Sequence, residues 1–370
     1  AADSPAALDR AAQSQTAVAD TAGMGTTSPA YAFGGAPPTV QQVDTDPTTV
    51  DGALTECETV NRQPVRRLLV RFDTAMFDPA GDSTAGDVTN PDGWLLVRPG
   101  ADASFSTTGC DGPSGDDEAV AIASVTYDDA TATAVIDANR ALEGDLYRLF
   151  ACGTGPSFLR DLGDNPLDGD GDGVGGDDFL RGFRSDPDNQ LANGHFDCGL
   201  DGWLPTSTLP QEITYAPEDD VDSSADSGSV AVENLSTSTF FSIDQCVATI
   251  AERDYELRAA IRMTTSAIGV LTGRGCENFS GPNCTGDSIG GLLRIAVLRP
   301  NSSDWASIGL AFPTFTGTVS TRCIIDFDPA NGVAFDARID RVELLTGNRV
   351  FEDDFESGDT GAWFTVIVQP

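Results

Sequence analysis

The chain has 370 residues, with 21 basic residues against 58 acidic ones and one histidine, so its formal net charge is −37. Every basic residue is an arginine, which excludes chemistry that needs a lysine, such as a Schiff base. The lone imidazole, His195, excludes metal sites built from several histidines. The lack of a basic surface disfavours nucleic acid as a partner. No apolar run reaches the roughly 18 residues that a membrane span requires.

The cysteines and the first residues suggest a compartment. The eight cysteines lack the Cys-x-x-Cys spacing of zinc sites, which favours disulfides in an oxidising environment. The sequence opens with Ala-Ala-Asp, as expected for a mature secreted product whose signal peptide has been removed. We therefore expect an extracellular or cell-surface protein. The 39 glycines and 21 prolines favour a turn-rich β architecture.

Residues 1–38 are rich in Ala, Ser and Thr and end in a Gly/Pro cluster, a composition typical of a flexible arm. A second interpretation is that the arm donates a strand to a neighbouring subunit, since strand addition does not require large side chains.

Residues 39–155 alternate short apolar runs with Asp, Gly, Pro and Ser clusters, which predicts a β-sandwich. The runs are RRLLVRF (66–72), WLLVR (94–98), AVAIASVTY (119–127), TATAVID (131–137) and LYRLFA (146–151). The segments VRFDTAMFDP (70–79) and ALEGDLYRLFACGT (141–154) resemble a bacterial Ig-like domain of secreted and surface proteins. The resemblance implies a spacer or display role without catalysis.

Residues 156–190 are expected to form an Asp-rich, calcium-binding linker between two domains, and they contain the strongest local motif, an Asp-Gly repeat that begins at Asp168. Carboxylates at alternate positions converge on one point when the backbone turns at glycines, and Ca²⁺ prefers such oxygen ligands. A solvated acidic linker is the alternative, but carboxylates packed this closely repel one another without a cation. The motif resembles calcium loops of the dockerin or thrombospondin-repeat kind. We expect the bound Ca²⁺ to lock two domains together through the carboxylates of Asp168, Asp170, Asp172, Asp177 and Asp178 and the Val174 carbonyl.

Residues 191–346 contain further strand-like runs and open with a signature that resembles jelly-roll carbohydrate-binding modules. The matching residues are Asn193, Gly194, Phe196, Gly199 and Trp203. The resemblance implies a jelly roll, in which Trp203 packs in the core, and an extracellular polysaccharide as a possible partner. His195 lies inside the signature and is interpreted as structural. Candidates for a glycan platform, with core burial as the alternative, are Trp305, Tyr255, Phe240 and Phe241.

Residues 347–370 include VFEDDFESGDTGAWFTVIVQP (350–370), which resembles a short C-terminal element of secreted gammaproteobacterial proteins. The final FTVIVQP has the composition of a β-strand.

The disulfide pairing is left open by the sequence. Three cysteines precede residue 190 and five follow it, so either one bridge crosses between the domains or each part leaves a thiol unpaired. The pairing that we favour is Cys276–Cys284, Cys246–Cys323, Cys152–Cys198 and Cys57–Cys110.

These features predict an all-β protein, an Ig-like sandwich and a jelly roll joined by a calcium loop. Two functions fit. The first is an extracellular structural protein, a filament or surface-layer subunit that forms a homo-polymer through its terminal strands. The second is a monomeric secreted glycan-binding adhesion protein. Enzyme activity is not expected, because no pair of carboxylates stands out as a glycosidase pair.

Overall fold

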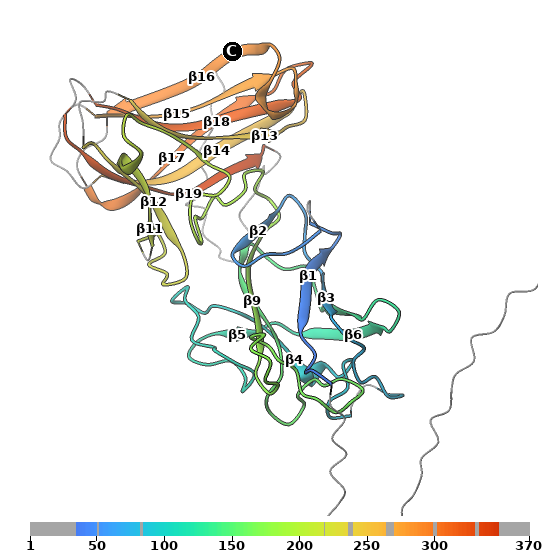
Figure 1. Ribbon diagram of the computed structural model, residues 1–370. Coiled ribbons are helices and arrows are strands. Elements are labelled where there is room, and N and C mark those ends of the chain that lie inside the picture. Colours follow the sequence, from blue (N-terminus) through green and yellow to red (C-terminus); the bar gives the residue numbers. More distant parts are fainter. Residues whose placement is uncertain are drawn as a thin grey trace, which may run out of the picture. The chain divides into compact units, whose positions relative to one another are not determined.

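The computed structural model describes residues 35–347 apart from 50–51, 82–83, 218, 236–239, 264–269, 299–301 and 330–332. The described residues form strands in four sheets, and their helical elements are short 3-10 turns, which confirms the all-β prediction (Figure 1). None of the described helices has the length and apolarity that a membrane span requires. The 3-10 turns are η1 (Pro91–Gly93), η2 (Pro210–Glu212) and η3 (Pro282–Cys284).

Two sheets form the first β-sandwich. One has the order β1 (Val40–Asp46), β3 (Arg67–Phe72), β7 (Thr133–Ala138), β6 (Ile122–Asp128). The other has the order β2 (Glu58–Asn61), β9 (Phe179–Asp186), β8 (Asp145–Ala151), β4 (Trp94–Arg98), β5 (Glu118–Ala119). Successive side chains of a strand point to opposite faces, so Leu68, Val70 and Phe72 of β3 enter the core while Arg67 and Arg71 face solvent.

Strand β9 changes the expected boundary between the domains. It lies within the segment 156–190 that was interpreted as a linker, yet it pairs antiparallel with β8 and parallel with β2. The side chains of Phe179 and Phe183 are buried in the core of the first sandwich. The Asp-rich segment is therefore a loop between β8 and β9 inside the first sandwich, and the chain passes to the second sandwich only after Asp186.

Two further sheets form the second β-sandwich. We call sheet F the one with the order β10 (Leu204–Thr206), β13 (Phe241–Ala248), β18 (Ser320–Pro329), β15 (Val270–Phe279), β16 (Ser288–Leu298). Sheet G has the order β11 (Ile213–Pro217), β12 (Gly228–Glu233), β19 (Asp336–Thr346), β14 (Asp254–Met263), β17 (Ser302–Pro313). Strands from both sheets contribute to one buried apolar core, as expected for a sandwich.

The signature at 193–203 has a packing explanation. Phe196 and Trp203 are buried with their ring centroids 5.6 Å apart, which confirms that Trp203 belongs to the core. The Trp203 Nε1–H donates to the Asn193 carbonyl at 2.9 Å. A Cβ at Gly194 would lie 2.0 Å from the Val342 carbonyl oxygen, so only glycine fits where this segment crosses β19.

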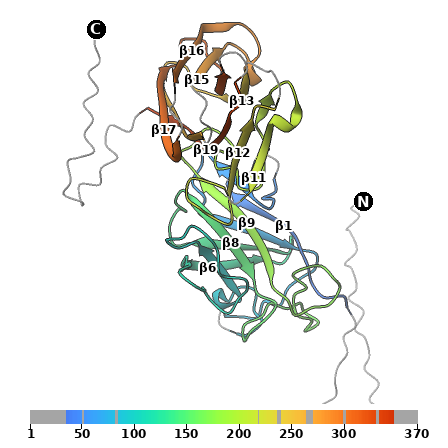
Figure 2. The same cartoon turned by 90° about the vertical axis from the view of Figure 1, so that its left-hand side faces the viewer.

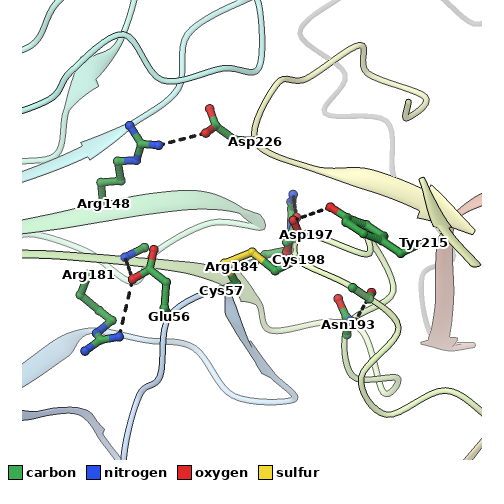
Figure 3. The surroundings of a disulfide bond; sticks show 12 residues. Glu56, Cys57, Arg148, Arg181, Arg184, Asn193, Asp197, Cys198, Tyr215 and Asp226 are labelled. Carbon is green, nitrogen blue, oxygen red and sulfur yellow. Dashed lines mark hydrogen bonds and ion pairs between the residues drawn. A yellow bond between two sulfur atoms is a disulfide. The ribbon is translucent and has the colours of Figure 1, made fainter. Parts of the chain in front are cut away.

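The joint between the sandwiches is covalent and ionic. The disulfide Cys57–Cys198 links them, and beside it Arg184 of β9 makes a buried bidentate ion pair with Asp197 (Figure 3). Arg148 of β8 donates to Asp226 at 2.9 Å. Hydrogen bonds between the loops 103–105 and 224–226 add to these contacts. Among the described residues, the contacts that join the two β-sandwiches thus come from outside the Asp-rich loop.

The disulfides differ from the favoured pairing, although one bridge crosses between the domains, which is the first of the two alternatives. The structure forms Cys57–Cys198, Cys110–Cys152 and Cys246–Cys284, and it leaves Cys276 and Cys323 as buried thiols. The alternation of strand side chains explains the difference. Cys276 and Cys323 are cross-strand partners that point into the core, whereas Cys246 points to the opposite face of its strand, toward Cys284.

Candidate functional site

Four aspartates of the β8–β9 loop meet at one point. Each of Asp168, Asp170, Asp172 and Asp177 offers a carboxylate oxygen, and these oxygens lie within 4.8 Å of one another. The backbone turns at Gly171, Gly173 and Gly176, whose φ angles of 76°, 92° and 110° are costly for other residues. Such a group of carboxylates is a candidate site for a metal ion.

Backbone amides fix the carboxylates of this group. Asp168, which is buried, accepts bonds from the amides of Gly171 and Gly173 at 2.7 and 2.8 Å. The Asp177 carboxylate accepts from the Asp170 amide at 3.0 Å. The Asp168 amide donates to the Pro38 carbonyl, so the loop also holds the segment that enters β1.

The fifth expected carboxylate lies elsewhere. Asp178 accepts bonds from the amides of Cys110, Gly153 and Thr154 at 2.8 to 2.9 Å, so it anchors the loop to the Cys110–Cys152 disulfide instead of joining the acidic group. Val174, whose carbonyl was the remaining predicted ligand, has an exposed side chain. Asp177 and Arg184 at the joint are seven residues apart, or about 23 Å of extended strand. Among the described residues, the hydrogen bonds of the acidic group stay within the first sandwich and its entry segment, so the expected locking of two domains stays a prediction.

A second polar group lies on the outer face of sheet G around Trp305. The Arg262 guanidinium lies 4.9 Å from the centre of the half-buried Trp305 ring. Asp219 accepts bonds from both Arg262 and Arg338, which are cross-strand partners on β14 and β19. Because Ile261 and Met263 enter the core, Arg262 points outward, and its stacking places the Trp305 ring on the same face.

The other predicted aromatic residues do not join Trp305. The Tyr255 side chain is 2% exposed and stacks on Phe312, with ring centroids 6.0 Å apart. A ring buried in this way cannot contact a glycan, so the prediction for Tyr255 is wrong. Phe241 is buried edge-on against Phe335. Phe240 is exposed, but it precedes β13 of sheet F, whereas Trp305 lies on sheet G.

A charged cleft of about 470 Å³ opens farther along the same face of sheet G, next to the joint. Arg258 of β14 lies in its wall, four residues from Arg262 or about 13 Å of strand. Its lining is Gly144, Asp145, Arg184, Asp186, Asp188, His195, Asp222, Arg258, Arg341, Glu343 and Leu345.

Burial shifts the titration of several groups in and near this cleft. Desolvation lowers the pKa of His195 well below its ordinary value, and the Arg184 and Arg341 charges act in the same direction. Desolvation also raises the pKa of Asp145 and of Asp186, whose carboxylate lies 3.7 Å from the His195 Nε2. The lowered pKa keeps the partly buried His195 imidazole neutral at pH 7, and its structural role stays a prediction.

The contribution of Arg262, Arg338 and Asp219 was not predicted. The run YELRAAIRM (255–263) contains the signal, because the arginines at 258 and 262 fall on the outward positions of a strand whose alternate residues are apolar. Asp219 carries no such signal, because it reaches the face from a loop.

No protein-family model matches the chain, and no curated protein matches it. Among solved structures, the enzymatically active domain of bacteriophage CBA120 tailspike protein 4 is 14% identical over 45% of this chain, with a TM-score of 0.36, and the match spans 22% of the tailspike chain. TmCBM61, solved with β-1,4-galactotriose, is 12% identical over 43% of this chain and 98% of its own, with a TM-score of 0.33. A structure described as one of the carbohydrate-binding modules of the β-sandwich superfamily is 10% identical over 83% of this chain and 98% of its own, with a TM-score of 0.32. These scores assign no function, which has to come from the residues described above.

Proposed function

We propose that this chain is a non-catalytic, extracellular glycan-binding protein whose binding surface is the outer face of sheet G around Trp305. The observation that carries the proposal is the half-buried Trp305 ring with the Arg262 guanidinium stacked on it, and with Asp219 and Arg338 bonded next to Arg262. Sugars are bound by apolar stacking on an aromatic ring together with a few well-placed polar groups, and this face supplies both.

The arginine that stacks on the ring is anchored by ion pairs, which favours binding. Arg262 is itself anchored by Asp219, so the Trp305–Arg262 contact is part of a network rather than a single flexible pair. A group that is already ordered loses little conformational entropy when a ligand binds. Arg258 and the charged cleft continue this face toward the joint, so a polymeric glycan can contact both places. The net charge of −37 repels anionic polymers, and we therefore propose a neutral polysaccharide.

The acidic loop is proposed to bind Ca²⁺ through Asp168, Asp170, Asp172 and Asp177. Carboxylate oxygens within 4.8 Å of one another repel strongly unless a cation lies between them, and hard divalent cations prefer such ligands. The bound ion would stiffen the loop and the adjoining entry to β1, where Asp168 contacts Pro38. The disulfides support an oxidising, extracellular setting for both functions.

Affinity electrophoresis in native gels that contain neutral polysaccharides tests the glycan proposal. The wild-type chain should be retarded, and Trp305→Ala should weaken binding by about tenfold or more, which corresponds to ~1.4 kcal/mol. Phe315→Ala is the matched control, because Phe315 is an exposed aromatic residue that packs against Gly290 of sheet F. Equal retardation of the wild type and Trp305→Ala would refute the assigned surface, and release of reducing sugar would refute a non-catalytic role.

The filament or surface-layer function, the first interpretation of the sequence, stays a prediction. Residues 1–38 and 347–370, which were expected to join neighbouring subunits, lie outside the described residues except for 35–38 and 347. Light scattering of the secreted chain over a range of concentrations separates a monomeric glycan-binding protein from a polymer subunit.

A further inference from the structure

Strand β16 is an exposed apolar edge of the second sandwich. It ends the order of sheet F, where it pairs with β15 (Figure 2). Its side chains Leu292, Leu293, Ile295 and Val297 are each between 41% and 47% exposed. Because successive side chains of a strand point to opposite faces, apolar surface is exposed on both faces of β16, next to a row of backbone groups that is open to pairing.

The other edges of this sandwich are protected in ways that β16 is not. The edge strand β10 has three residues and includes Pro205, β11 has five and includes Pro217, and β17 carries Asp304 and ends at Pro313. Short length, proline and charge are the usual means by which proteins prevent edge pairing. Strand β16 has eleven residues without proline, and its one charge, Arg294, is bound to Asp326. A bulge at Gly290 and Gly291 interrupts only its first residues, so the edge from Leu292 onward is regular.

The chain itself contains a segment that fits this edge. Residues 363–369, WFTVIVQ, place Phe364, Val366 and Val368 on one side of an extended strand, with Thr365 and Ile367 on the other. The segment is rich in β-branched residues, which favour strands. It follows an acidic stretch and offers apolar side chains on both sides, as β16 does.

The end of β19 brings this segment within reach. The Gly347 amide donates to the Asp254 carbonyl, and the adjacent Arg253 carbonyl accepts from the Thr314 amide, both at 2.7 Å. Phe315 in turn packs against Gly290, the third residue of β16, where an added Cβ would lie 2.4 Å from the ring. The chain therefore leaves the described fold close to where β16 begins.

The connecting residues are long enough. Residues 348–362 span up to about 50 Å when extended, whereas β16 is about 37 Å long. A tether of this length gives the segment an effective concentration in the millimolar range, which favours pairing within one chain over pairing between dilute copies.

We propose that residues 363–369 add to β16 of their own chain as a sixth strand of sheet F. The added strand satisfies the backbone groups of the β16 edge and covers Leu293, Ile295 and Val297. This internal strand addition is independent of the glycan proposal, because β16 lies in sheet F and Trp305 on sheet G.

Hydrogen exchange measured by mass spectrometry on the full chain tests the proposal. The amides of 288–298 that face the free edge should exchange at least about tenfold more slowly in the wild type than in Val366→Pro, since proline removes a donor and breaks the added strand. Thr360→Pro, a proline in the connecting stretch, is the matched control and should leave the protection unchanged. A reciprocal variant, Ile295→Lys on β16, should remove the protection of residues 363–369.

The outcomes are distinct. Slow exchange of both segments, lost in Val366→Pro and Ile295→Lys while light scattering shows a monomer, supports the proposal. Equal exchange of 288–298 in the wild type and Val366→Pro overturns it. Oligomers that Val366→Pro dissolves also overturn it, because the segment would then pair with a second copy. Unchanged near-ultraviolet circular dichroism of Ile295→Lys shows that this variant folds.

Discussion

Arg184→Met is expected to destabilise the joint between the sandwiches far more than a surface change of the same kind. In the wild type, Arg184 and Asp197 form a bidentate pair with side chains 10% and 2% exposed. The variant keeps a buried apolar side chain of similar length but leaves the Asp197 carboxylate buried without its cation. Breaking a buried pair in this way costs about 3–5 kcal/mol.

Calorimetry at pH 7 measures this cost. At about 2–4 °C per kcal/mol for a domain of this size, the melting temperature should fall by roughly 6–20 °C. Arg67→Met is the control, because Arg67 pairs with Asp46 and Asp137 at the surface and its loss should cost at most about 1 kcal/mol. The double variant Arg184→Met/Asp197→Leu should recover most of the loss, since the unpaired charge is gone. A single variant that melts within 2 °C of the wild type would refute the reasoning.

Three further predictions concern titration, cation binding and disulfides. Burial raises the pKa of Asp340 to about 7. The protonated carboxyl therefore stabilises the fold below pH ~4, and this contribution is lost as the pH rises through 7. The variant Asp340→Asn should flatten the dependence of the urea midpoint on pH between 4 and 8, and an unchanged slope would contradict this. Chelation should lower the melting temperature of the wild type but not of Asp170→Asn, with Mg²⁺ and Na⁺ as controls for screening. Equal changes in the melting temperatures of the two proteins would contradict the proposed Ca²⁺ site. Peptide mapping without reduction should recover Cys57–Cys198, and a Cys152–Cys198 peptide would contradict the structure.

The periodicity of apolar residues made the β architecture predictable from the sequence. The contacts between segments that are distant in the sequence could not be predicted. The alternating apolar residues of β3 follow from side chains that point to opposite faces of a strand. Strand β9 was missed because its sequence, FLRGFRSD, contains two arginines and an aspartate, and Arg184 is buried only because Asp197 comes to meet it. Local sequence cannot reveal such a partner.

The candidate sites divide in the same way. Four of the predicted metal ligands meet because the spacing of aspartates and glycines within one loop determines the geometry. Asp178 departs from them because its amide partners come from residues 110, 153 and 154. Tyr255 and Trp305 look alike in sequence as strand aromatics, but the strand register buries one ring and leaves the other on the surface.

The most direct test of the proposed function is the equilibrium binding of soluble neutral oligosaccharides, measured by isothermal titration calorimetry on the wild type and Trp305→Ala, with Phe315→Ala as control. The proposal predicts saturable binding by the wild type and the control, weakened about tenfold or more by Trp305→Ala. It also predicts the same affinity in chelator, because Trp305 and the acidic loop lie in different sandwiches. Binding that Trp305→Ala leaves unchanged, or no binding across a panel of neutral glycans, would contradict it.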